Sequence, residues 1–162
     1  MYKKITIFVL SAVIFFTLST QSALAYDFTS TPVKVVIPSL SLSLPVTTAR
    51  VTSDTWEVSL TGASYGDSTA LPGTVGNTVI FAHARDRLFA TLPQVKKGDI
   101  VHVFTKEDWL VYEIVETKIV NPEDISVLAD SDERILTLYT CIGDDYAKRF
   151  IVRARLATGF TP

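Results

Sequence analysis

The sequence contains one cysteine, Cys141, and its surroundings suit nucleophilic chemistry. It follows an apolar, β-branched run, residues 135–140, and opens a polar loop that begins Ile-Gly-Asp-Asp. A substrate can reach a thiol at the end of a strand, whereas an inert thiol more often lies buried within one. A free thiol is mostly protonated at neutral pH, so a catalytic cysteine needs a base or a cation beside it.

The chain offers two histidines as that base, His83 and His102. His83 directly follows the short β-branched run of residues 77–82, which reads as a buried strand, and it leads into the polar stretch Ala-Arg-Asp-Arg. His102 lies in the middle of the alternating run Ile-Val-His-Val-Phe, where a half-exposed sheet residue is expected. His83 is therefore the predicted partner of Cys141.

An arginine near the end of the chain provides a cation. If residues 135–140 and 150–156 pair as a hairpin, Cys141 lies opposite Arg149, and Arg153 lies opposite Thr137. Four residues along a strand span about 13 Å, so only one of these arginines can lie beside the sulfur. The register favours Arg149, which could hold a thiolate and donate hydrogen bonds to an oxyanion.

The elements that must position these groups are mostly strands. Residues 33–38 and 40–46 alternate with a period of two but contain prolines, which predicts edge strands. Residues 62–76 are rich in turn formers and predict a long loop, and residues 87–92 predict a short helix ended by Pro93. The remaining predicted elements are strands at 77–82, 100–105, 109–117 with a continuation at 119–120, 135–140 and 150–156, and a turn or short helix at 122–125. About eight strands with one or two short helices predict an all-β closed barrel, in one domain covering residues 26–162.

The local sequences around the three candidate residues resemble those of the sortase family. Thr-Leu-Tyr-Thr-Cys, ending at Cys141, resembles the T-L-x-T-C signature of sortases, and Asn-Thr-Val-Ile-Phe-Ala-His, ending at His83, resembles their histidine strand. Lys-Arg-Phe-Ile-Val-Arg-Ala, residues 148–154, is similar to their arginine strand, in which the first arginine is the catalytic one. The resemblance runs from about Pro32 to Leu156 and is closest to the smaller class D- and E-like sortases. One departure is Ala82, because sortase histidines are commonly preceded by glycine; another is the short loop between Cys141 and Arg149.

The resemblance implies a closed sortase-type β-barrel with cysteine transpeptidase activity. Cys141 would attack a carbonyl in an L-P-x-T-G-like motif near the C-terminus of an exported protein, giving a thioacyl enzyme. His83 would transfer protons to and from the two amines, and Arg149 would steady the substrate and the oxyanion. Thr140 and Ala82 are expected to contribute to substrate binding. The amine acceptor would come from a cell-wall precursor or a pilin lysine, and neither a cofactor nor a metal is implied.

The N-terminus predicts export. Lys3 and Lys4 precede an uncharged, largely apolar segment, residues 5–25, that ends in Ala-Leu-Ala. This pattern fits a signal peptide cleaved after Ala25, and the segment is also long enough to remain as a membrane anchor. Either outcome places the rest of the chain on the outer side of the cell membrane. Without the two lysines the chain has 13 basic and 17 acidic residues, so nucleic acid is not an expected partner.

Three alternatives stay open from the sequence. A hydrolytic cysteine peptidase would use the same three groups and accept water in the second step. A non-catalytic, β-rich surface module would require an inert Cys141. A zinc site formed by Cys141, His83 and His102 is conceivable, although none of these ligands is closely spaced in the sequence.

Overall fold

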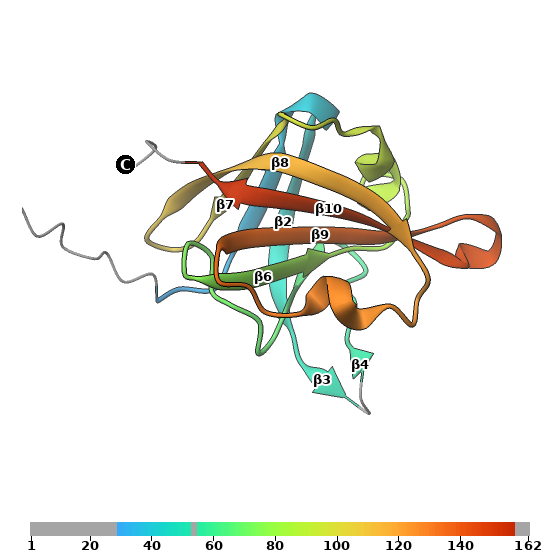
Figure 1. Ribbon diagram of the computed structural model, residues 1–162, viewed down its shortest axis with the longest axis horizontal. Helices are drawn as coiled ribbons and strands as arrows, with labels where there is room; N and C mark the ends of the chain where they lie inside the picture. The colour runs from blue at the N-terminus through green and yellow to red at the C-terminus, as the bar shows by residue number, and fades with distance from the viewer. Residues whose placement is uncertain (1–28, 53–54, 158–162) are drawn as a thin grey trace, which may run out of the picture.

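Eight strands close into a barrel in the order β1-β2-β5-β6-β9-β10-β8-β7 in this computed structural model, which describes residues 29–52 and 55–157 (Figure 1). The barrel strands are β1 (Lys34–Ile37), β2 (Leu42–Ala49), β5 (Ala63–Gly66), β6 (Gly76–Phe81), β7 (Ile100–Phe104), β8 (Trp109–Val120), β9 (Arg134–Ile142) and β10 (Lys148–Leu156). Two further strands and four short 3₁₀ helices join them: β3 (Val51–Thr52), β4 (Thr55–Trp56), η1 (Pro38–Leu40), η2 (Phe89–Gln94), η3 (Ile125–Leu128) and η4 (Asp144–Tyr146). The predicted all-β closed barrel is confirmed.

The predicted signal peptide or anchor, residues 1–25, lies outside the described residues. Within residues 29–52 and 55–157, no helix has the length and apolar character that crossing a membrane would require.

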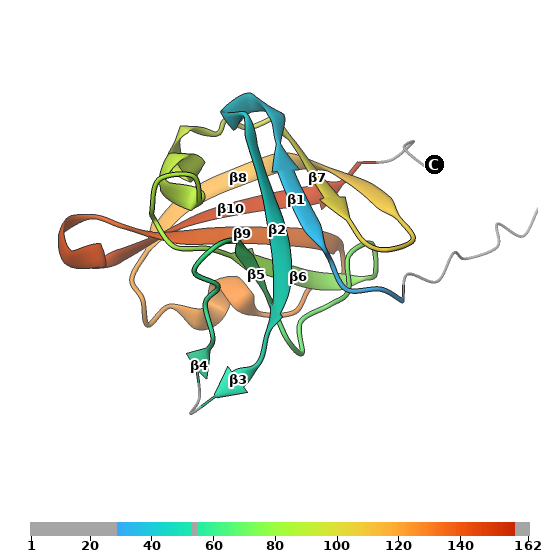
Figure 2. The same ribbon diagram turned by 180° about the vertical axis from the view of Figure 1, so that it is seen from behind.

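Pairing within the barrel is mixed. The pairs β2–β5 and β6–β9 are parallel, and the other barrel pairs are antiparallel. A parallel pair needs a long connection. The β3–β4 hairpin lies within the connection from β2 to β5, and it projects below the barrel in both views (Figures 1 and 2). The connection from β6 to β9 contains η2, β7, β8 and η3.

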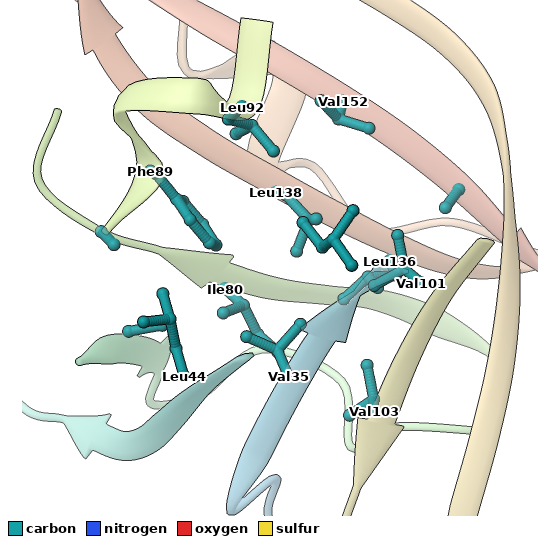
Figure 3. Packing of buried hydrophobic residues seen from close by; sticks show 14 of the residues in the cluster. Val35, Leu44, Ile80, Phe89, Leu92, Val101, Val103, Leu136, Leu138 and Val152 are labelled. Atoms are coloured by element: carbon teal, nitrogen blue, oxygen red, sulfur yellow. The ribbon is translucent and has the colours of Figure 1, made fainter. Parts of the chain in front are cut away.

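The barrel interior is a packed apolar core. Alternate residues of each strand point inward because successive side chains lie on opposite faces of a sheet. Leu136 and Leu138 of β9 and Ile80 of β6 are fully buried there, together with Phe89 and Leu92 of η2 (Figure 3). With the interior filled, a substrate-accessible site must lie on the outer face or at an end of the barrel.

The prediction of edge strands at residues 33–38 and 40–46 was wrong, because β1 pairs with both β2 and β7 and the barrel closes. Pro45 is tolerated for a local reason. The Val46 N–H donates to the Val33 carbonyl at 2.9 Å, so the position of the missing Pro45 N–H faces away from β1. On that side, pairing with β5 begins only at Val46.

The prediction of an uninterrupted loop over residues 62–76 was also wrong, because the segment contains β5, whose four residues are all buried. Three of the four residues, Ala63, Ser64 and Gly66, have little β-propensity, so packing rather than local preference decides the conformation of this strand. At Gly66 a Cβ atom would come within 2.7 Å of the Trp56 ring, so only glycine fits beneath that indole without displacement.

The helix predicted at residues 87–92 is a 3₁₀ helix over Phe89–Gln94, and Pro93 lies inside it rather than ending it. Arg87 has a φ of 62°, and Leu88, with φ −114° and ψ −135°, lies outside the helical region. Neither residue can begin a helix in these conformations. The helix therefore starts at Phe89, whose ring enters the core.

Candidate active site

Cys141 lies on the outer face of β9, one residue before the strand ends. Leu136 and Leu138 point into the core, so the alternating residues Tyr139 and Cys141 point outward. The thiol is half-buried and makes no disulfide. The strand extends one residue beyond the thiol, through Ile142, and the predicted accessible position near the strand end is confirmed.

Arg149 is the direct cross-strand partner of Cys141 in the antiparallel β9–β10 pair, as the predicted hairpin register required. Directly paired residues lie on the same face of a sheet, so the two side chains share the outer face. The Arg149 Nη1 donates hydrogen bonds to the carbonyl oxygens of Tyr146, at 2.9 Å, and Lys148, at 3.2 Å. Arg153 pairs with Thr137, four residues away along the strand.

His83 reaches the same place from β6. Phe81, the last residue of β6, pairs with Tyr139 in the parallel β6–β9 pair, so the chain leaves β6 beside the end of β9. His83 is two residues further on, and its carbonyl accepts a hydrogen bond from the Phe89 N–H at 3.1 Å. This bond ties the histidine backbone to the start of η2, which the core holds in place.

The two residues predicted to bind substrate, Ala82 and Thr140, are both buried and contact each other. The Thr140 Oγ1 donates a hydrogen bond to the Ala82 carbonyl at 2.8 Å. The bond joins the residue before Cys141 to the residue before His83. Both residues also line the groove described next, and the hydroxyl of Thr140 already has a partner within the protein.

All five predicted site residues line one groove. Its volume, about 630 Å³, is within the usual size range of ligand pockets. Its remaining walls come from β3 and β4 with the chain just beyond them, from residues 67–69, and from Leu128 and Tyr139. A second hollow of about 140 Å³ is lined by Ala84, Arg85 and Tyr146 together with His83 and Cys141. The thiol and the imidazole therefore border both spaces.

One wall of the groove is a stack of three aromatic rings. Trp56 stacks on Phe81 with ring centroids 5.4 Å apart, and Phe81 stacks on Tyr139 at 5.0 Å. Burial raises the pKa of Tyr139 to about 12, against the opposing effect of the nearby Arg149 charge. The groove is thus apolar along one wall and polar at the end that holds Cys141 and Arg149.

Sequence reasoning missed this aromatic wall. Phe81 lies two residues before His83, and Tyr139 lies two residues before Cys141. Residues two apart in extended chain lie on the same face, so this spacing was the available signal in the sequence. No comparable pattern marked Trp56, whose position depends on the contact with Gly66.

His102 lies elsewhere, on β7, where it accepts a hydrogen bond from the indole N–H of Trp109 at 3.0 Å. It is half-exposed, as predicted, and burial lowers its pKa. It is not among the residues lining the groove that holds Cys141 and His83. Residues 29–52 and 55–157 contain no group of three potential ligands that could hold a metal ion, so the zinc alternative has no support there.

Comparisons with known proteins agree with this geometry. The model of the sortase domain family matches residues 35–157. A curated sortase A from Bacillus anthracis is 30% identical over 127 residues, covering 76% of this chain and 58% of the relative. A curated sortase D from Bacillus subtilis is 29% identical over 129 residues, covering 75% of this chain and 62% of the relative. The crystal structure of Listeria monocytogenes sortase A superposes with a TM-score of 0.68 at 29% identity, covering 78% of this chain and 88% of that one.

The chain spans about three fifths of the length of these curated relatives. Since they include both a sortase A and a sortase D, the class D- or E-like subtype remains a prediction. The family itself is established by the match over most of the barrel, from Val35 to Ala157, and this chain belongs to the sortase family.

Proposed function

We propose that this protein is a cysteine transpeptidase that cleaves a C-terminal sorting motif of exported proteins and joins the new end to an amine. The observation that carries the proposal is the pairing of Cys141 with Arg149 on the outer face of the barrel, at the end of a groove that also receives His83. A nucleophile, a proton carrier and a fixed cationic donor are the groups that acyl transfer requires.

In the first half-reaction the Cys141 thiolate forms a bond to the carbonyl carbon of the sorting motif, and the carbonyl oxygen becomes an oxyanion. When this intermediate collapses, the C–N bond breaks and His83 gives a proton to the departing amine. In the second half an incoming amine gives its proton to His83 and attacks the thioester. The C–S bond breaks and the thiolate is restored.

The role of Arg149 is to stabilise the oxyanion. A guanidinium carries five N–H donors, and the carbonyls of Tyr146 and Lys148 accept from one nitrogen, Nη1. Other donors remain for a substrate oxygen. The two carbonyl contacts fix the orientation of the side chain before substrate binds, which lowers the reorganisation needed during reaction.

The groove favours an extended peptide with apolar residues. The stacked rings of Trp56, Phe81 and Tyr139 offer an apolar surface along one wall, which suits the leucine and proline of an L-P-x-T-G-like motif. The acceptor amine, from a cell-wall precursor or a pilin lysine, would enter from the second hollow, where the thiol and the imidazole are also accessible.

Both substrates lie outside the cell membrane, so the proposed location of the barrel is extracytoplasmic. Residues 5–25 would hold it on the membrane as an anchor; cleavage after Ala25 would release it.

The test is ligation by the full chain in mild detergent, with a panel of L-P-x-T-G-like peptides and an amine acceptor. Product should form with the wild-type chain and disappear in C141A, H83A and R149A. R153A is the matched control, because Arg153 lies on the same strand four residues away from Arg149, opposite Thr137. Peptide hydrolysis without ligation would favour a hydrolytic peptidase. An unreactive Cys141, shown by a thiol probe under native conditions, would favour a non-catalytic surface module.

A further inference from the structure

A cluster of aromatic and basic side chains lies on the outer face of β1, β7 and β8, away from the groove. It consists of Lys34, His102, Phe104 and Trp109 and is called the outer aromatic patch here. Register places Lys34 opposite Phe104, and Phe104 opposite Trp109, so these three side chains form one row across three strands. The Phe104 and Trp109 rings stack with centroids 5.8 Å apart, and the Lys34 ammonium lies 5.5 Å from the centre of the Phe104 ring.

This patch is open to its surroundings. Trp109 is 51% exposed, which is unusual for the largest apolar side chain, and Lys34 is also exposed. The indole N–H of Trp109 is already bonded to His102, so the ring can enter a less polar medium without losing a hydrogen bond to water.

The start of the described chain is fastened beside this patch. The Ser30 hydroxyl donates a hydrogen bond to the Glu107 carboxylate in the β7–β8 turn, and the Val33 N–H donates to the Phe104 carbonyl at 2.8 Å. The first described residues and the β7–β8 turn lie at one end of the molecule, and the β9–β10 loop lies at the other (Figures 1 and 2).

The covalent chain limits how far this end can be from a membrane. Ser30 lies five positions after Ala25, the last residue of the uncharged segment. Five residues extend at most about 17 Å, which is comparable with the depth of the headgroup and interfacial layer plus a thin water layer. If residues 5–25 remain in the bilayer, the β7–β8 turn must stay close to its surface.

We propose that the outer aromatic patch rests in the interface of the lipid bilayer and sets the orientation of the barrel on the membrane. This proposal rests on the part of the proposed function in which residues 5–25 stay in the membrane as an anchor. Tryptophan rings concentrate at the membrane interface, and a lysine can place its stem along apolar surface while its ammonium stays among headgroups. The combination of Trp109, Phe104 and Lys34 at the anchored end matches that chemistry.

The orientation has a consequence for the reaction. Val120, at the far end of β8, pairs with Arg149, which pairs with Cys141. Val120 lies eleven positions after Trp109 along β8, a path of roughly 35 Å at about 3.3 Å per residue. A patch seated at the bilayer would hold the thiol well out from the membrane, where extended surface proteins and wall precursors are accessible.

The chain is suited to a direct test because Trp56 and Trp109 are its only tryptophans. The W56F variant leaves Trp109 as the sole reporter. The matched control is the Tyr146→Trp variant with W56F and W109F, which moves the reporter to the β9–β10 loop at the other end of the molecule. Tyr146 is 60% exposed, so both reporters are similarly accessible in solution. Each full chain is placed in phosphatidylcholine vesicles that carry bromine on the acyl chains near the glycerol backbone, since bromine quenches indole emission at short range.

The W56F variant should show a blue-shifted emission and several-fold more quenching by brominated lipid than the Tyr146→Trp control. Equal, weak quenching of both chains, while both float with the vesicles, would overturn the patch assignment and leave the anchor intact. Failure of an intact chain to float would overturn the proposed membrane location together with the patch. If lipid does not quench Trp109 but soluble wall saccharides shift its emission, the patch binds a saccharide instead of the bilayer. If the emission instead shifts with protein concentration, the patch binds a second copy of the chain. Because ligation is not measured, none of these results depends on the proposed transpeptidation.

Discussion

Replacing Thr140 by valine should separate two roles of this residue, positioning and direct substrate contact. The Thr140 hydroxyl is buried and donates to the Ala82 carbonyl at 2.8 Å. Valine has nearly the same shape and cannot donate, so the carbonyl loses this partner. Leaving a buried acceptor unpaired costs about 1–3 kcal/mol, and each kcal/mol lowers Tm by about 2–4 °C in chains of 150–250 residues.

The same substitution should also slow the reaction, because Ala82 precedes His83 and a misplacement of about 1 Å can cost up to about 100-fold in rate. Thermal unfolding followed by circular dichroism measures the first effect, and ligation kinetics with a fixed peptide and acceptor measure the second. Thr140→Ser is the matched control, since serine keeps the hydroxyl and should retain most of kcat. The positioning role would be refuted by an unchanged Tm in Thr140→Val. If activity nevertheless fell, the hydroxyl would have to act on the substrate itself.

Three further substitutions test the surroundings of the site. Gly66→Ala should displace Trp56, because the new Cβ would come within 2.7–3.0 Å of three atoms of its ring. In ligation kinetics KM should therefore rise with little change in kcat. Adding Trp56→Phe, which has a smaller ring, should relieve part of the strain. Asn77→Leu should lower the free energy of unfolding by about 2–5 kcal/mol in denaturant titrations. The Asn77 amide donates hydrogen bonds to the carbonyls of Val127 and Ala129, and leucine would leave these carbonyls without that donor. Burial raises the pKa of Tyr112 to about 12, above its ordinary value of 10, so its contribution to stability is complete below pH 10 and is lost as pH rises towards 12. Tyr112→Phe should therefore be less stable at neutral pH, because it lacks the 2.8 Å hydrogen bond from the Gly73 N–H. Between pH 10 and 12 it should lose less stability than the wild-type chain in pH-dependent unfolding. An unchanged dependence of the unfolding free energy on pH in this range would contradict this reasoning.

The sequence was sufficient for the strands with strong alternation or uninterrupted β-branched runs. The predicted strand at residues 77–82 appears as β6, and the pairing of Cys141 with Arg149 appears in the predicted register. The register was predictable because a hairpin with a short loop leaves few ways to pair two apolar runs. Placing Arg149 rather than Arg153 beside the sulfur followed from that register alone.

Elements fixed by packing could not be predicted in the same way. The strand β5 contains three small residues and the buried Tyr65, and its conformation is decided by neighbouring strands and by the Trp56 ring. The hairpin of β3 and β4 contributes Trp56 and Val51 to the groove, yet its few residues carry no clear period. The aromatic wall depends on contacts between rings that are distant in the sequence, and only the spacing of Phe81 and Tyr139 from the two site residues hinted at it.

The structure also accounts for the residues around Cys141 in physical terms. Residues 137–141 alternate between the two faces of β9, and a threonine on each face donates a hydrogen bond to the neighbouring segment that contains β6 and Ala82, the residue directly after it. On the outer face the Thr137 Oγ1 donates to the Asn77 Oδ1 at 2.7 Å, and on the inner face the Thr140 Oγ1 donates to the Ala82 carbonyl. A slip of one residue between these parallel strands would remove both bonds and turn the Cys141 side chain into the core. The two threonines therefore fix the register that exposes the thiol, which explains why threonine, rather than an equally β-forming valine, occupies both positions.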